Sequence, residues 1–156
     1  MTNIFKKLGV NSIYEIEINL KRVDFSMVNL KHDNYLKIAE LFKKILGNKI
    51  TTKEYVYAFY FTHNYILKGY AEISNGGTKQ SFVENKIVAQ HAVLLLAENV
   101  VLIHNHPTGI CKPSLADLKV YETLNEGLNF LHINLLDFII VSDVDVWSIN
   151  DKKEEE

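Results

Sequence analysis

Two histidines, one residue apart at the end of an apolar run, constrain the fold of this chain more than any other feature. The run, Asn99-Val100-Val101-Leu102-Ile103, is rich in β-branched residues and predicts a buried strand. Because side chains two residues apart on a strand point to the same side, His104 and His106 are expected to project together from its end. Pro107 has no amide hydrogen and is expected to end the strand pairing there.

A carboxylate is predicted to come back towards these two imidazoles from the next helix. Residues 107–113 contain a Thr-Gly turn and lead to Ser114, near which a helix is expected to begin. Asp117 lies in the first turn of that helix and can face His104 and His106. Two neutral nitrogens and one carboxylate suit zinc, and three protein ligands leave the fourth position open for water, as in catalytic zinc sites.

Helix capping explains part of this pattern without a metal. Ser114 and Asp117 have the spacing of a capping box, with the serine as N-cap and an acidic residue at the third helical position. A histidine pair at a strand end is also compatible with a hydrogen-bonded turn. Neither alternative explains why two histidines converge on the same loop, and Ser114 can cap the helix while still donating its hydroxyl hydrogen.

Several motifs taken together resemble one known family. They are His104-Asn105-His106-Pro107-Thr108-Gly109, Pro113-Ser114, Asp117, and Leu135-Leu136-Asp137 followed by Ile139-Ile140-Val141. This set is similar to the RadC-like branch of the JAB (JAMM, MPN+) metalloprotein superfamily, over residues from about Glu54 to Val146. The resemblance implies a cytidine-deaminase-like JAB/MPN fold, an α/β architecture in which helices flank a mixed central β-sheet.

The resemblance also implies a chemistry. It makes His104, His106 and Asp117 ligands of Zn²⁺ and makes the protein a zinc-dependent hydrolase of amide bonds, a metallopeptidase or isopeptidase. It places Glu54 where the superfamily keeps its catalytic glutamate, the general base for a water on the zinc. The Ser114 hydroxyl would stabilise the oxyanion together with the metal. By sequence alone, Glu54 is an ordinary charged residue at the start of a strand.

Three nearby residues have weaker claims to the site. Glu72 is a rival base, but it lies near the end of a strand and is expected to face sheet or solvent. Cys111 lies in the loop before Ser114, where a thiolate could bind zinc, although the family does not use such a ligand. Phe138 stands where many relatives carry histidine, which removes a polar group near the site.

The rest of the chain predicts alternating strands and helices. We expect a strand at 15–20, a helix capped by Asp33 and ended by Gly47, a hairpin of strands 55–61 and 65–73, a helix at 83–98, a helix from Ser114, and strands at 133–141 and 144–149. Residues 1–50 are expected to form an N-terminal strand and helix that belong to the same domain as the JAB/MPN region at 51–150. Residues 151–156 are expected to be a disordered charged tail.

Composition narrows the function classes. A length of 156 residues fits one domain, and a net charge of −2 gives no excess of positive charge to attract phosphate backbones. The single cysteine, the lack of an apolar core in residues 1–7 and the absence of a run of about 20 apolar residues together favour a cytoplasmic protein away from membranes.

Three function classes stay open at this point. The first is the zinc hydrolase, acting on a peptide or protein substrate of unknown identity. The second is a DNA-associated protein, because relatives are traditionally labelled DNA-repair proteins, although many of those carry a helix-hairpin-helix module that residues 1–53 do not resemble. The third is a non-catalytic scaffold, disfavoured because the ligand set is complete. A homodimer formed along a sheet edge is compatible with each of them.

Overall fold

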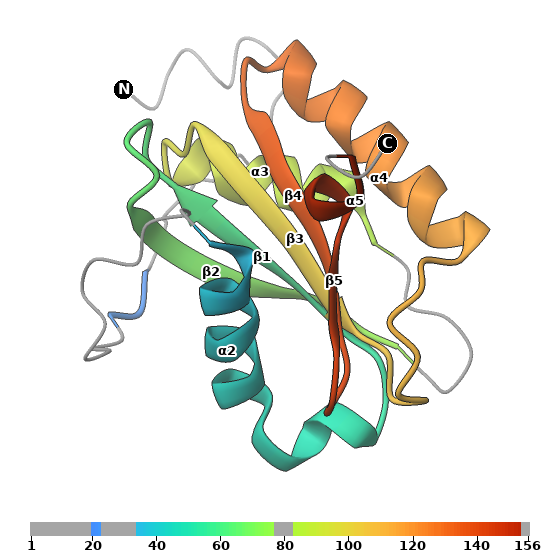
Figure 1. Cartoon of the computed structure of the whole chain (residues 1–156). Coiled ribbons are helices and arrows are strands. Elements are labelled where there is room, and N and C mark those ends of the chain that lie inside the picture. The colour runs from blue at the N-terminus through green and yellow to red at the C-terminus, as the bar shows by residue number, and fades with distance from the viewer. Residues whose placement is uncertain (1–19, 23–33, 77–82, 154–156) are drawn as a thin grey trace, which may run out of the picture.

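A computed structural model describes residues 20–22, 34–76 and 83–153 of the chain. In this part, a five-stranded mixed sheet has the strand order β2-β1-β3-β4-β5. Helix α2 covers one face of the sheet, and α3 and α4 cover the other (Figure 1). The α/β architecture expected from the sequence, a mixed sheet flanked by helices, is therefore confirmed. The elements are α2 (Tyr35–Leu46), the 3₁₀ turn η1 (Gly47–Thr51), β1 (Tyr55–Phe61), β2 (Leu67–Asn75), α3 (Asn85–Leu94), β3 (Asn99–Asn105), α4 (Leu115–Phe130), β4 (Asn134–Val141), β5 (Val146–Ser148) and α5 (Ile149–Lys153).

Strand β3, which carries the histidine motif, lies at the centre of the sheet. It pairs antiparallel with β1 and parallel with β4, and every residue from Asn99 to Asn105 is buried. A strand that is covered on both faces has apolar residues at successive positions, which is why residues 99–103 do not alternate between apolar and polar. Because both neighbours of β3 are hydrogen-bonded to it, the end of this strand is a rigid position for functional side chains.

The two faces of the sheet bury separate apolar cores. On one face, Val56, Ala58 and Tyr60 of β1 pack with residues of α3 and α4. On the other face, Tyr57 and Phe59 of the same strand pack with α2. This alternation along β1 explains the aromatic sequence of the hairpin, whose rings fill the core on both sides of the sheet. In the described ranges, no helix is long and apolar enough to cross a bilayer.

Two expected boundaries near the N-terminal side of the sheet are wrong. Helix α2 is capped by Asn34 instead of Asp33, because the Asn34 side chain accepts a hydrogen bond of 2.7 Å from the backbone N–H of Leu36. The second hairpin strand begins at Leu67 instead of residue 65, because Tyr65 takes a positive φ of 62° in the turn. Gly47 does end α2, with a φ of 53°. Of the strand expected at 15–20, residues 15–19 lie outside the described ranges, and Leu20 is not in a strand.

Two further expectations fail in the second half of the chain. Helix α3 ends at Leu94 instead of continuing to residue 98, because the chain turns at Leu96, where φ is 49°. Residues 151–153, expected to be disordered, belong to α5. The Ser148 hydroxyl oxygen accepts a hydrogen bond of 3.1 Å from the backbone N–H of Asn150, which starts this short helix. Residues 154–156 lie outside the described ranges.

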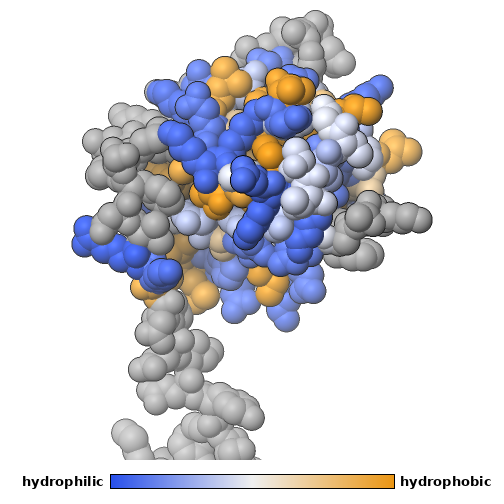
Figure 2. All heavy atoms as spheres, turned by 90° about the horizontal axis from the view of Figure 1, so that it is seen from below, coloured by the Kyte–Doolittle hydropathy of each residue, from blue (hydrophilic) through white to orange (hydrophobic). Residues whose placement is uncertain are grey.

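The surface seen from below is mainly polar. Figure 2 shows that hydrophilic side chains predominate on this face, with hydrophobic spots that are separated from one another. Apolar area is therefore not gathered into one continuous patch on the side of the molecule that this view shows.

Candidate metal centre

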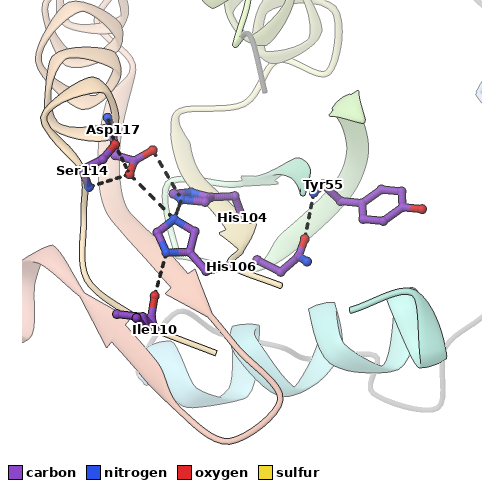
Figure 3. Close-up of polar contacts among 7 residues, drawn as sticks. Tyr55, His104, His106, Ile110, Ser114 and Asp117 are labelled. Carbon is purple, nitrogen blue, oxygen red and sulfur yellow. Dashed lines mark hydrogen bonds and ion pairs between the residues drawn. The ribbon is translucent and has the colours of Figure 1, made fainter. Parts of the chain in front are cut away.

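His104 and His106 converge at the carboxyl end of β3, as their spacing predicts. Their Nε2 atoms lie 3.0 Å apart, and the ring centroids are 4.8 Å apart (Figure 3). His104 belongs to the strand, opposite Val56 of β1 and Ile140 of β4. His106 follows the strand directly, and its backbone N–H donates to the carbonyl of Val141 at 2.9 Å. The central sheet therefore fixes the backbone from which both imidazoles project.

The ring of His106 has a defined orientation. Its Nδ1 lies 2.7 Å from the carbonyl oxygen of Ile110, which can only accept a hydrogen bond, so Nδ1 carries the hydrogen. In the neutral ring, Nε2 then presents a lone pair towards His104. A backbone carbonyl on the outer nitrogen is the usual way in which proteins orient a metal-binding histidine. A neutral His104 can therefore donate a hydrogen from its Nε2 to the lone pair of His106 at 3.0 Å, and a metal ion bound to both Nε2 atoms would take the place of that hydrogen.

Asp117 completes a group of three ligand atoms from two elements. It stands in the first turn of α4, with Oδ1 3.5 Å from Nε2 of His104 and Oδ2 3.7 Å from Nε2 of His106. A tetrahedral site with metal–ligand distances of about 2.0–2.1 Å has edges of about 3.3 Å between ligand atoms. The Nε2–Nε2 separation and each histidine's separation from its nearer Asp117 oxygen are close to such an edge. With one ligand atom taken from each residue, the three atoms lie within 4.8 Å of one another. This group can hold a metal ion.

Capping and convergence on the histidines coexist at Asp117. The backbone N–H and the hydroxyl of Ser114 both donate to Oδ2 of Asp117, each at 2.7 Å, and the Ser114 hydroxyl oxygen accepts from the backbone N–H of Asp117 at 3.2 Å. The capping box expected from the sequence is therefore present. It holds the carboxylate so that Oδ1 faces His104. The Ser114 hydroxyl hydrogen is used in this cap, so the oxyanion role predicted for it would require the hydroxyl to turn.

Glu54 lies beside this group, immediately before the adjacent strand β1. It directly precedes β1, and because Val56 is paired with His104, the same register continued by two residues brings Glu54 opposite His106. Burial is the main cause that raises the pKa of the Glu54 carboxyl, and the negative charge of Asp117 raises it further, against an opposing effect of His106. A half-buried carboxylate with a raised pKa holds a proton more readily than an exposed one.

His104 is kept neutral by its surroundings. It is 2% exposed, and its ring packs at 5.2 Å against the ring of Phe138. Burial lowers the pKa of His104 to about 4, against the opposing charge of Asp117 and with a smaller lowering by His106. A neutral imidazole is the form that binds metals. The ring of Phe138 therefore supports the imidazole by packing.

The pKa of His104 predicts how the metal-free protein responds to acid. Between an ordinary pKa of 6.5 and the folded value of about 4, the unfolded chain binds a proton at His104 and the folded chain does not. Stability is therefore expected to fall as the pH decreases through this window. Urea midpoints measured from pH 7 to pH 4 on chelator-treated protein test this. The loss of stability between pH 7 and pH 4 should be smaller in His104→Gln than in the wild type. An equal loss of stability in the two proteins would contradict the prediction.

The weaker candidates lie outside the group. Glu72 accepts hydrogen bonds from the Tyr57 hydroxyl and the Asn75 amide, which gives it a structural role on the hairpin. The Cys111 thiol hydrogen-bonds with Ser142, and burial is the main cause that raises its pKa. Among the described residues, the group that could hold a metal consists of His104, His106 and Asp117, and it does not include Cys111.

The sequence did not single out Asn105, which stands between the two histidines. Its side chain is completely buried and hydrogen-bonded to backbone groups of Ile50, Lys53 and Tyr55, in the segment that leads into β1. The available signal was a polar residue inside an otherwise apolar strand, with its side chain on the face opposite to the histidines.

Comparisons with known proteins connect most of this chain to one family. The family model for the RadC-like JAB domain matches residues 33–154. The chain is 30% identical over 148 residues to a UPF0758 protein of Chlorobaculum tepidum, which covers 94% of this chain and 64% of that protein. It is also 30% identical over 155 residues to a UPF0758 protein of Streptococcus suis, covering 94% of this chain and 61% of the relative. The chain thus spans slightly less than two thirds of the length of these two relatives.

Proposed function

This chain belongs to the RadC-like JAB domain family, and from that premise we propose that it is a zinc-dependent hydrolase of amide bonds, acting as a metallopeptidase or isopeptidase on a peptide or protein. The observation that carries the proposal is the convergence of His104, His106 and Asp117 at the spacing of metal ligands. His104 is in the central strand, His106 directly follows it, and Asp117 is in the first turn of a capped helix. A set of two imidazoles and one carboxylate leaves one position of a tetrahedral zinc site for solvent.

The residues present fit zinc in their chemistry as well as in their spacing. His106 presents its Nε2 lone pair because its Nδ1 donates a hydrogen bond to the backbone carbonyl of Ile110. His104 is neutral because it is buried. Asp117 adds the single negative charge of the set, oriented by the cap from Ser114. When bound there, zinc would supply a Lewis acid that lowers the pKa of a water from 15.7 towards about 7.

Glu54 is proposed as the group that moves the proton. Its carboxylate would accept a proton from the attacking water and deliver it to the nitrogen of the leaving group. The raised pKa supports this role, because a base works best when its pKa lies near the operating pH. The Ser114 hydroxyl, if it turns from Asp117, would donate to the oxygen of the scissile carbonyl, a contribution of about 2.7–4 kcal/mol in other acyl-transfer sites.

The proposal predicts stoichiometric zinc and zinc-dependent cleavage. Protein produced with zinc in the medium is expected to retain the metal through gel filtration, as measured by elemental analysis. Incubated with a library of linear and isopeptide-linked peptides, it is expected to release products detectable by mass spectrometry. Chelation should stop the cleavage and added zinc should restore it. Zinc-loaded protein that cleaves none of these amides would contradict the hydrolase and favour the scaffold, and a salt-dependent gel shift with duplex DNA would favour the DNA-associated alternative.

A further inference from the structure

The carboxamide of Asn105 connects the histidine strand to the segment that carries Glu54. Its Oδ1 accepts a hydrogen bond of 2.8 Å from the backbone N–H of Tyr55. Its Nδ2 donates to the carbonyl oxygens of Ile50 at 2.7 Å and Lys53 at 2.8 Å. The side chain is 0% exposed. Oδ1 and both hydrogens of Nδ2 are therefore engaged with backbone groups about 50 positions earlier in the chain.

These partners enclose Glu54 from both sides. The Lys53 carbonyl lies immediately before Glu54 and the Tyr55 N–H immediately after it, so one carboxamide closes a bridge across the Glu54 backbone. On the side facing β2, the Glu54 carbonyl accepts a hydrogen bond of 3.1 Å from the backbone N–H of Gly76. The backbone of Glu54 is thus held between β3 and the end of β2.

His104, Asn105 and His106, at the carboxyl end of β3, contact both the Asp117 side of the site and the segment that carries Glu54. Because side chains alternate along the strand, His104 and His106 point to the side of Asp117, and Asn105 points to the opposite side. Asn105 therefore cannot contact a metal held by the histidines. Asn105 can affect the site only through the segment to which it is hydrogen-bonded, and this segment leads into β1 and carries Glu54.

We infer that Asn105 is a positioning residue that sets the distance between Glu54 and the metal ligands. The inference rests on the proposed role of Glu54 as the proton acceptor. The three hydrogen bonds need one acceptor and two donors on the same side chain, and the asparagine carboxamide provides all three. Ionised aspartate has the same shape and no donor, and alanine has neither group. Displacement of a catalytic group by about 1 Å can reduce a rate about 10²-fold.

Asn99 provides a matched control on the same strand. It is also buried, at 2% exposed, and also uses its carboxamide to hold a distant segment: Nδ2 donates to the Thr62 carbonyl at 2.8 Å and Oδ1 accepts from Asn134 at 2.9 Å. It lies six residues before Asn105, about 20 Å away along an extended strand. Asn99→Asp therefore makes the same chemical change in the same strand, far from Glu54.

The first experiment uses Co²⁺ in place of zinc, so that no substrate is needed. Visible spectra of Co²⁺-loaded protein are compared for Asn105→Asp, Asn105→Ala and Asn99→Asp, each alone and combined with Glu54→Gln. Both Asn105 variants are expected to change the bands in the direction that Glu54→Gln does, and to change nothing further in the Glu54→Gln background. Asn99→Asp should leave the bands as in the wild type. Wild-type bands in the Asn105 variants, or equal changes in both backgrounds, would overturn the inference.

Turnover gives the second readout. With zinc bound, Asn105→Asp is expected to lower kcat about 10²-fold with KM unchanged, whereas Asn99→Asp is expected to leave both kcat and KM at the wild-type values. A loss that appears in KM alone would mean that Asn105 does not act through Glu54. If the wild type binds Co²⁺ but hydrolyses no amide, the hydrolase proposal fails, while the spectra still decide whether Asn105 positions Glu54.

Discussion

Replacing Glu54 with glutamine is expected to abolish amide hydrolysis while zinc stays bound. Glutamine keeps the length and shape of the side chain, but its neutral amide does not accept a proton. General acid–base groups typically contribute about 10²–10⁴-fold to a rate, and Glu54 is proposed to act both as base and as acid in one turnover. None of the three candidate ligands is altered by the change. The measurements are kcat on zinc-loaded protein and zinc content by elemental analysis.

Glu72→Gln is the matched control for this experiment. Glu72 lies on the strand next to β1, and its hydrogen bonds from Tyr57 and Asn75 tie it to the hairpin. The hydrogen bond from Asn75 is the main cause that lowers the pKa of the Glu72 carboxyl, so it is a weaker base than Glu54. This variant should keep zinc and turnover. If Glu54→Gln turned over at the wild-type rate, or Glu72→Gln did not, the proton acceptor would not be Glu54.

The parts of the site that could be predicted from sequence depend on local geometry. The convergence of His104 and His106 follows from the two-residue period of a strand, which acts over a few residues. The capping box of Ser114 and Asp117 is likewise a short-range pattern. The fold class could be predicted for a similar reason, since apolar runs and periodic stripes reflect which faces of each element are covered.

The parts that could not be predicted depend on contacts between distant segments. The placement of Glu54 opposite His106 follows from the register of β1 on β3, which no local pattern determines, so it came from the family resemblance. The role of Asn105 depends on carbonyl groups about 50 residues away. Element ends were missed where one local interaction decided them. The cap by Asn34 and the positive φ at Leu96 are examples, because several neighbouring residues were equally suited to those positions.

Asp117→Asn is expected to remove zinc from the protein without unfolding α4. The neutral amide keeps an oxygen that can accept from the backbone N–H of Ser114, so most of the cap survives. The single negative charge among the three candidate ligands is lost, together with a carboxylate oxygen that zinc prefers over an amide. Elemental analysis after gel filtration should find zinc in the wild type and little in Asp117→Asn. His106→Ala, which deletes a different ligand and leaves the cap untouched, should lose zinc as well.

Ser114→Ala separates the two roles of Asp117, because it removes a capping hydroxyl and none of the three ligand atoms. Loss of such an N-cap costs about 1 kcal/mol of stability, measurable by urea unfolding. Zinc content should stay close to that of the wild type. Zinc lost from Ser114→Ala to the same extent as from Asp117→Asn would mean that the cap, and not the carboxylate charge, holds the site together. A wild-type zinc content in both Asp117→Asn and His106→Ala would show that the ion lies elsewhere, and it would contradict the hydrolase proposal.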